Sequence, residues 1–217
     1  MTYTLSFANI SVPVPIIQGG MGVRISMAEL AAAVANEGGI GIIAGTGLTP
    51  EEVVEEIRKA RKLTDGVIGI NVLFAASQFS ELVQAAMKEG IDLVISGAGF
   101  SRDMFKWGKQ YHTPIVPVVS SDKFAVLAEK FGAAAVVVEG KEAAGHLGTD
   151  RPLFDILPEV LHAVNIPVIA AGGISNGEEI MKALQMGASG VQMGTIFAAS
   201  EESNASDDMK RMYVQAK

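Results

Sequence analysis

One histidine of this chain lies in a sequence context that suits proton transfer. His146 stands in the segment 139–148 (EGKEAAGHLG), directly after the apolar run 135–138, with glycines close on both sides. Imidazole exchanges protons near neutral pH, so histidine is a frequent general acid or base. The other two histidines, His112 and His162, precede apolar runs instead of following them. A loop histidine is often only a solvated residue, but the position of His146 favours a catalytic role.

Two further segments, each at the end of a run of apolar residues, carry groups that suit a flat ligand. The first is QGGMG (18–22), whose glycines would let a planar group approach the backbone without interference from Cβ atoms. A tight turn is the alternative explanation of those glycines. The second is Asn71 within GINVL (69–73), where a carboxamide in an apolar strand needs hydrogen-bond partners. Asn71 could bind a heterocycle or bridge neighbouring strands, and the sequence leaves both open.

The glycine-rich ends at 170–177 (AAGGISNG) and 190–195 (GVQMGT) predict an anion site. In a barrel of eight parallel strands they would follow strands seven and eight, where a phosphate site recurs. Backbone N–H groups and a helix N-terminus at such a place attract a phosphoryl group. Gly172, Gly173, Gly194 and Thr195 are the candidate contacts, and ordinary strand-to-helix turns are the alternative.

Eight short apolar runs, rich in valine and isoleucine, set the positions of these groups. They cover residues 15–21, 39–45, 67–74, 93–99, 114–120, 135–140, 167–173 and 190–195. Such continuous runs are typical of strands buried on both faces of a parallel sheet. Helical patterns alternate with them at 26–36, 49–61, 80–89, 122–131 and 177–186, and a last helix is expected at 207–216. The alternation predicts an α/β fold, a (β/α)8 TIM barrel in one domain over residues 1–217, with an open doubly wound sheet as the alternative.

Local signals fix several helix ends. Ser26 and Thr49 are the expected N-caps of the first two helices, and Pro50 suits the first helical position of the second. Gly90, Gly132 and Gly187 follow helical patterns and are the expected C-terminal stops.

Composition excludes several classes of function. The 217 residues are 49% hydrophobic and carry a formal net charge of −7, which argues against disorder and against nucleic-acid binding. The chain has no cysteine, so disulfides, thiolate metal sites and cysteine nucleophiles are excluded. It has no HExxH or CxxC motif and no dense ligand cluster, so we expect no metal. Without a signal peptide or a long apolar span, we expect a cytoplasmic protein with no membrane partner.

Six segments, taken together, resemble the nitronate monooxygenase (2-nitropropane dioxygenase) family and its relatives, the flavin-dependent enoyl-acyl-carrier-protein reductases. They are PIIQGGMG (15–22), GINVL (69–73), SGAG (96–99), EGKEAAGHLG (139–148), PVIAAGGI (167–174) and VQMGTIF (191–197). The resemblance implies an FMN-binding barrel whose cofactor carries the redox chemistry. It also implies residue roles, with His146 as the catalytic residue. The cofactor contacts it implies are Gly20, Met21, Gly22 and Asn71 beside the flavin ring, Gly145 near it, and Gly172, Gly173, Ile174, Gly194 and Thr195 at the phosphate, with Gln192 close by.

The sequence departs from the family pattern at two points. Ala144 stands where many members carry glycine, and the chain ends at Lys217, so we expect the family's covering C-terminal segment to be absent.

The resemblance implies a first function and leaves two alternatives. The first is an FMN-dependent oxidoreductase that oxidises alkyl nitronates with O2 to a carbonyl compound and nitrite. The alternatives are an enoyl-acyl-carrier-protein reductase that uses FMN and NAD(P)H, and a non-catalytic flavin-binding barrel. The partner is then a small molecule, either a nitronate or an enoyl thioester, and a homodimer is one assembly left open.

Overall fold

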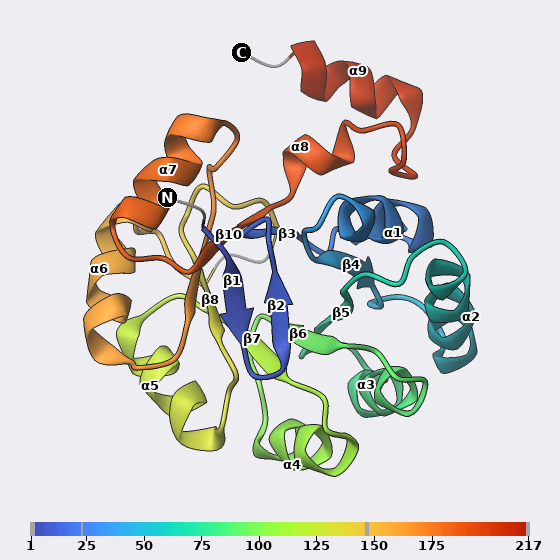
Figure 1. Ribbon diagram of the computed structural model, residues 1–217, viewed down its shortest axis with the longest axis horizontal. Helices are drawn as coiled ribbons and strands as arrows, with labels where there is room; N and C mark the ends of the chain where they lie inside the picture. Colours follow the sequence, from blue (N-terminus) through green and yellow to red (C-terminus); the bar gives the residue numbers. More distant parts are fainter. Residues whose placement is uncertain (1–2, 23, 146–147, 216–217) are drawn as a thin grey trace.

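The computed structural model describes residues 3–22, 24–145 and 148–215, and within them eight parallel strands form a barrel surrounded by helices (Figure 1). The strands are β3 (Ile16–Gln18), β4 (Gly41–Ala44), β5 (Ile68–Leu73), β6 (Leu93–Gly97), β7 (Ile115–Val119), β8 (Val136–Glu139), β9 (Val168–Ala171) and β10 (Gly190–Met193). The helices are α1 (Ala28–Asn36), α2 (Pro50–Arg61), α3 (Phe79–Lys88), α4 (Arg102–Tyr111), α5 (Asp122–Phe131), α6 (Leu153–Ala163), α7 (Gly177–Gln185), α8 (Thr195–Ala198) and α9 (Asp207–Gln215). Each barrel strand lies inside one of the eight predicted apolar runs. The TIM-barrel prediction is therefore confirmed.

The barrel closes where β3 meets the start of β4. Ile17 pairs with Ile40 in a parallel bridge, and the Gln18 amide N–H donates to the Ile40 carbonyl at 2.9 Å. Beyond that point the Gln18 side chain replaces the backbone, because its Oε1 accepts the Ile42 N–H at 2.9 Å. The open-sheet alternative is therefore wrong.

Loss of the Gln18 carboxamide should weaken this closure. Gln18 is fully buried, so Gln18→Leu leaves the Ile42 N–H without an acceptor inside the protein. We expect the free energy of unfolding to fall by about 1–3 kcal/mol, measured by denaturant titration. Gln185→Leu, at an exposed position of α7, is the matched control and should change it by less than about 0.5 kcal/mol. Equal stability of the two variants would contradict the role of Gln18 in closing the barrel.

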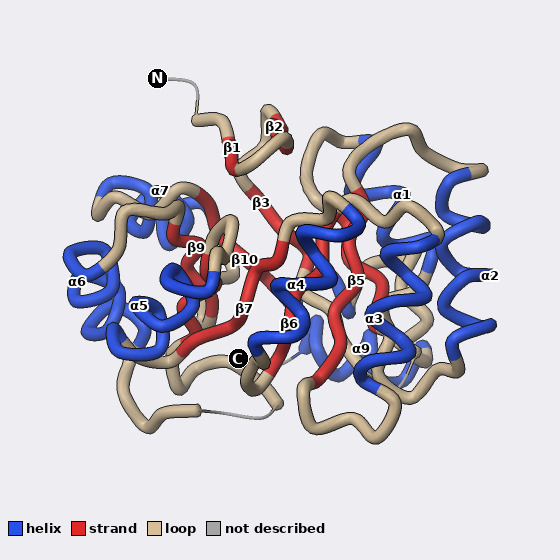
Figure 2. Tube along the Cα trace, turned by 90° about the horizontal axis from the view of Figure 1, so that it is seen from below, coloured by secondary structure: helices blue, strands red, loops and turns tan. Residues whose placement is uncertain are grey.

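A short hairpin, which the sequence reasoning missed, covers the amino-terminal end of the barrel (Figure 2). Its strands are β1 (Leu5–Phe7) and β2 (Ile10–Val12), each with two buried residues flanking an exposed serine. Leu5, Phe7, Ile10 and Val12 pack in one cluster with barrel residues such as Val137. The hairpin therefore closes the end of the barrel opposite to the loops that follow the strands.

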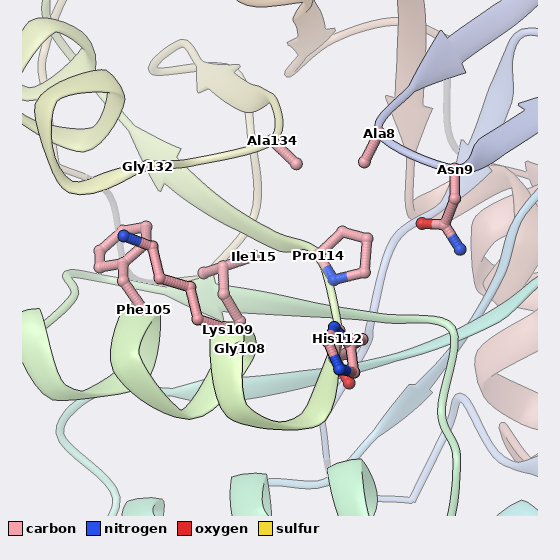
Figure 3. Close-up of a pocket in the computed structure, with 11 residues that line it drawn as sticks. Ala8, Asn9, Phe105, Gly108, Lys109, His112, Pro114, Ile115, Gly132 and Ala134 are labelled. Carbon is pink, nitrogen blue, oxygen red and sulfur yellow. The ribbon is translucent and has the colours of Figure 1, made fainter.

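Two histidines lie away from the strand-end loops, as predicted. His112 ends α4 with a φ of 55° and lines a surface hollow with Ala8 and Asn9 of the hairpin turn (Figure 3). His162 is exposed on α6, with Nδ1 2.6 Å from the Pro158 carbonyl. Neither histidine can reach a site at the other end of the barrel.

The helix starts confirm one predicted cap and correct another. Thr49 and Glu52 form a reciprocal capping box ahead of α2. The prediction for Ser26 is wrong: Met27 is the N-cap of α1 and gives no side-chain cap. The hydroxyl of Ser26 instead accepts hydrogen bonds from Gln18 Nε2 at the end of β3 and from the Met21 N–H in the loop after it, which holds that loop in place.

The three predicted glycine stops lie at the ends of helices. Gly90, Gly132 and Gly187 follow helices with φ of 83°, 96° and 111°, which is the left-handed conformation expected of glycine stops. Helices α4, α6 and α8 lie outside the helical patterns given above. No described helix has the length and apolar character needed to cross a membrane. The assignment of the whole chain to one domain stays a prediction.

Candidate cofactor-binding site

The loop after β3 is fixed by hydrogen bonds from both sides. Ser26 Oγ accepts the Met21 N–H at 2.9 Å, and the Gly19 N–H donates to the Met193 carbonyl at 2.7 Å. Asn71 on β5 donates from Nδ2 to the Gly20 carbonyl at 3.2 Å. A Cβ on Gly20 would lie 2.4 Å from the Asn71 Cβ, so this approach requires glycine. The structure thus brings Gly20 and Asn71 together, and their contact with a flavin ring stays a prediction.

Two carboxamide oxygens near this loop are buried without a partner. Among the described residues, Asn71 Oδ1 and Gln192 Oε1 accept no hydrogen bond. Gln192 lies against the same loop, because a Cβ on Gly19 would be 3.5 Å from its Cγ. Buried polar atoms are nearly always paired, so two orphaned acceptors at one place indicate a missing donor. A ligand with an N–H group on its edge would supply one.

The predicted phosphate contacts lie on the loops after β9 and β10. Gly172 and Gly173 have φ of 108° and 71°, and Gly172 packs closely against the backbone of Gly140. Gly194 is the N-cap of α8, and Thr195 is its first residue. Among the described residues, the backbone N–H groups of Gly173 and Thr195 find no acceptor. These amides are therefore available to an anion.

Two details differ from the sequence-based expectation for this end of the site. The N-terminus of α7 is already occupied, since Asn176 Oδ1 accepts from the N–H groups of Glu178 and Glu179 at 3.0 Å. The start of α8, which was not predicted as a helix, carries the free amide of Thr195 instead. The side chain of Ile174 is 6% exposed and packs in the apolar cluster between the strands and the helices, so only its backbone is left for a ligand.

The loop between β8 and α6 is tied down at both ends. The Lys141 N–H donates to the Arg151 carbonyl at 2.9 Å, and Ser120 Oγ donates to the Gly148 carbonyl at 3.1 Å. Gly145 has a φ of 107°, and a Cβ there would meet open space. Gly22 is also exposed, with open space where a Cβ would be. His146 lies outside the described residues, so its catalytic role stays a prediction.

Glu139, the last residue of β8, is an acidic group at this site that sequence reasoning did not single out. Burial raises the pKa of its carboxyl to about 7, from an ordinary value of 4.5. The signal for it was present in the sequence, because Ala135, Val137 and Glu139 alternate along one strand and so share one face. Among the described residues no group of three or more potential metal ligands was found.

Comparisons with known proteins identify the family to which this chain belongs. Residues 4–217 match the family profile described as "Nitronate monooxygenase". The chain is 35% identical over 205 residues to the "(3aS,4S,5R,7aS)-5-hydroxy-7a-methyl-1-oxo-octahydro-1H-indene-4-carboxyl-CoA dehydrogenase" of Mycobacterium tuberculosis, covering 93% of this chain and 57% of that protein. It is 30% identical over 254 residues to a "Probable nitronate monooxygenase" of Staphylococcus aureus, covering 96% of this chain and 71% of the relative.

Solved structures agree in fold and in sequence. FabK from Thermotoga maritima superposes with a TM-score of 0.92 at 38% identity, over 95% of this chain and 66% of that one. A nitroalkane oxidase from Streptomyces ansochromogenes superposes with a TM-score of 0.85 at 29% identity, over 92% and 70%. The chain spans only 57% of the length of the mycobacterial relative. Because the family profile covers nearly all of its residues, the chain belongs to the nitronate monooxygenase family.

Proposed function

We propose that this chain is the FMN-binding barrel of a flavin-dependent oxidoreductase. The observation that carries the proposal is the pair of orphaned buried acceptors, Asn71 Oδ1 and Gln192 Oε1, beside the glycine loop at Gly19–Gly20. An isoalloxazine ring is flat and has an N–H on its polar edge, so it fits both the glycine surface and the missing donor. A bound flavin supplies the redox centre that takes electrons from one substrate and passes them to another.

The residues present fit the other parts of FMN as well. Gly20, Met21 and Gly22 offer backbone to the ring, and Gly145 offers open space beside it. The unpaired amides at Gly173 and Thr195 suit a phosphate, with Gly172, Gly194 and the Ile174 backbone around them. Exposed backbone N–H groups at the ends of strands seven and eight of a barrel are a common phosphate site. The phosphate contacts favour FMN over riboflavin.

His146 is the residue we propose for proton transfer, on the basis of its place in the loop between β8 and α6. With a neutral nitroalkane its imidazole would remove the α-proton, and with a nitronate it would hold the anion. With an enoyl thioester it would hydrogen-bond the carbonyl or return a proton to the carbon chain. Each role needs one nitrogen of the ring within hydrogen-bond reach of the substrate.

Two substrate classes follow from the relatives. Oxidation of alkyl nitronates with O2 is supported by the family profile and by the staphylococcal relative. Reduction of an enoyl thioester with NAD(P)H is supported by the 38% identity and TM-score of 0.92 to FabK. The mycobacterial relative, whose name describes a dehydrogenase of a CoA thioester, supports the thioester class as well.

One pair of assays separates these functions. The FMN-loaded chain is given propionate 3-nitronate with O2, and separately crotonyl thioester with NADH. Nitrite formed without a pyridine nucleotide supports nitronate oxidation, whereas NADH loss that requires the thioester supports reduction. A chain that binds FMN and catalyses neither reaction is the non-catalytic alternative and contradicts the proposed oxidoreductase.

Removal of the two carboxamides should weaken FMN binding. Asn71→Leu and Gln192→Leu each delete an acceptor, and Asn71→Leu also frees the Gly20 carbonyl. We expect the Kd for FMN to rise about two- to tenfold in each variant whose deleted oxygen accepts the flavin N–H, since one hydrogen bond contributes about 0.5–1.5 kcal/mol. The Kd is measured by quenching of flavin fluorescence.

The matched control for these variants is Asn165→Leu, at an exposed position before β9. It removes a carboxamide far from the strand-end loops and should leave the Kd unchanged. If all three variants bind FMN as the unmodified chain does, Asn71 and Gln192 do not contact the ring.

A further inference from the structure

A carboxyl group lies at the mouth of the barrel, in the same layer as the proposed flavin contacts. Ala135 and Val137 of β8 pack in the cluster that fills the barrel, whereas Val136 and Val138 pack in the cluster shared with the helices. Successive strand residues point to opposite faces, so Glu139 points into the barrel. It is the last residue of β8, at the end where the cofactor site lies.

The strand register places Glu139 level with Gln192. Glu139 pairs with Ala171 of β9, and Ala171 pairs with Gln192 of β10. Val191 and Met193 pack in the outer cluster, so Gln192 also faces the barrel interior. Adjacent strands lie about 4.8 Å apart, so the two residues are about 10 Å apart across the barrel wall. A ligand that contacts Gln192 therefore lies within electrostatic range of Glu139.

No positive charge compensates this carboxyl among the described residues. The Glu139 carboxyl makes no hydrogen bond to a described residue, and the cause of its raised pKa is burial. The charged residues on the segments next to it, in the loop that follows and at the starts of α5 and α7, contribute nothing to that shift. They are Lys141, Glu142, Asp150, Arg151, Asp122, Lys123, Glu178 and Glu179.

We propose that Glu139 is a specificity-determining residue, whose ionised carboxylate selects neutral ligands over anions in the flavin pocket. The inference rests on the proposed function, since it assumes that FMN occupies this end of the barrel. A like charge in a partly desolvated site opposes an anion strongly. The substrate class that this pocket favours above neutral pH is therefore a neutral carbonyl compound, such as an acyl thioester at its reacting end, and a small nitronate anion is disfavoured.

The test uses nitrate, a planar anion that does not titrate in this range, with the FMN-loaded full chain. Nitrate binding is followed through the flavin absorbance between pH 6 and pH 8. With a carboxyl pKa of about 7, the protonated fraction falls about tenfold across this range, so the Kd for nitrate should rise about tenfold. Glu139→Gln keeps the shape of the side chain and should remove this rise.

Controls separate Glu139 from other titrating groups. Glu81→Gln removes the same charge from an exposed position on α3 and should keep the full rise. All measurements are repeated in a His146→Ala background, so that titration of the imidazole cannot produce the effect. The dependence on Glu139 should persist there.

Each outcome decides one claim. If the folded chain binds no FMN, the proposed function fails. If FMN binds but the nitrate profiles of Glu139→Gln and the unmodified chain coincide, or if nitrate does not bind at pH 6, the selection role of Glu139 is overturned. Melting temperatures of the ligand-free proteins check the titration of Glu139 independently. From pH 5 to pH 8, the melting temperature of Glu139→Gln should rise relative to that of the unmodified chain. The sign follows because ionisation of a buried, unpaired carboxyl disfavours the folded state.

Discussion

Replacement of Gly173 by aspartate is expected to abolish FMN binding. Gly173 has a φ of 71°, and a Cβ there would lie 3.0 Å from the Glu142 Cβ, so an aspartate at this position strains the backbone and crowds Glu142. It also brings a negative charge to the loop that we propose for the phosphate. Two unit charges about 4 Å apart interact by about 4 kcal/mol at an effective dielectric constant near 20. We therefore expect the Kd for FMN to rise at least 100-fold, about 2.8 kcal/mol, in a titration followed by flavin fluorescence.

Gly90→Asp is the matched control for this variant. Gly90 follows α3 with a φ of 83°, and a Cβ there meets no neighbour within 4 Å. It introduces the same residue into the same left-handed backbone region, at the other end of the barrel. If both variants fold and Gly173→Asp binds FMN as tightly as Gly90→Asp does, the phosphate of FMN does not bind at the loop after β9.

Replacement of His146 by alanine is expected to lower turnover by about 10²–10⁴-fold, the usual contribution of a general acid or base. The residue follows β8 in a loop rich in small residues and belongs to no apolar stripe, so the fold should not depend on it. FMN affinity and melting temperature should therefore stay close to those of the unmodified chain. Turnover is measured with a neutral nitroalkane and with an enoyl thioester plus NADH.

His162→Ala provides the comparison, because His162 is exposed on α6 and has no place in the site. It should keep full turnover. If His146→Ala also keeps full turnover while chemistry limits the rate, another group moves the proton. A large loss of FMN affinity or of stability in His146→Ala would instead indicate a structural role.

Much of the fold could be predicted because parallel barrel strands are buried on both faces. Runs such as 167–173 are therefore continuous in apolar residues and glycine, and this one contains strand β9 of the structure. The hairpin of β1 and β2 was missed because each strand has only three residues, too few for its alternation to stand out. The cap at Thr49 was found because its partner Glu52 is local in sequence. Ser26 was misassigned because its partners, Gln18 and Met21, belong to a different element.

Parts of the candidate site could be predicted where the signal lies within the residues of a single loop. Strand-end glycines such as Gly173 carry a signal in their residue type and position, and the structure gives Gly173 a positive φ. The contact of Gly20 with Asn71 joins residues 51 positions apart and depends on closure of the barrel. The orphaned oxygens and the raised pKa of Glu139 arise from burial, which appears only when the strands are assembled.

In the proposed function, the loops at the carboxyl ends of the barrel strands hold FMN by its ring and its phosphate. The most direct test is a titration of the folded 217-residue chain with FMN and, in parallel, with riboflavin. We expect saturable binding of one FMN per chain, with a Kd at least 100-fold lower than that of riboflavin, because riboflavin lacks the group that pairs with the amides of Gly173 and Thr195. A folded chain that binds no FMN, or that binds riboflavin as tightly as FMN, would contradict it.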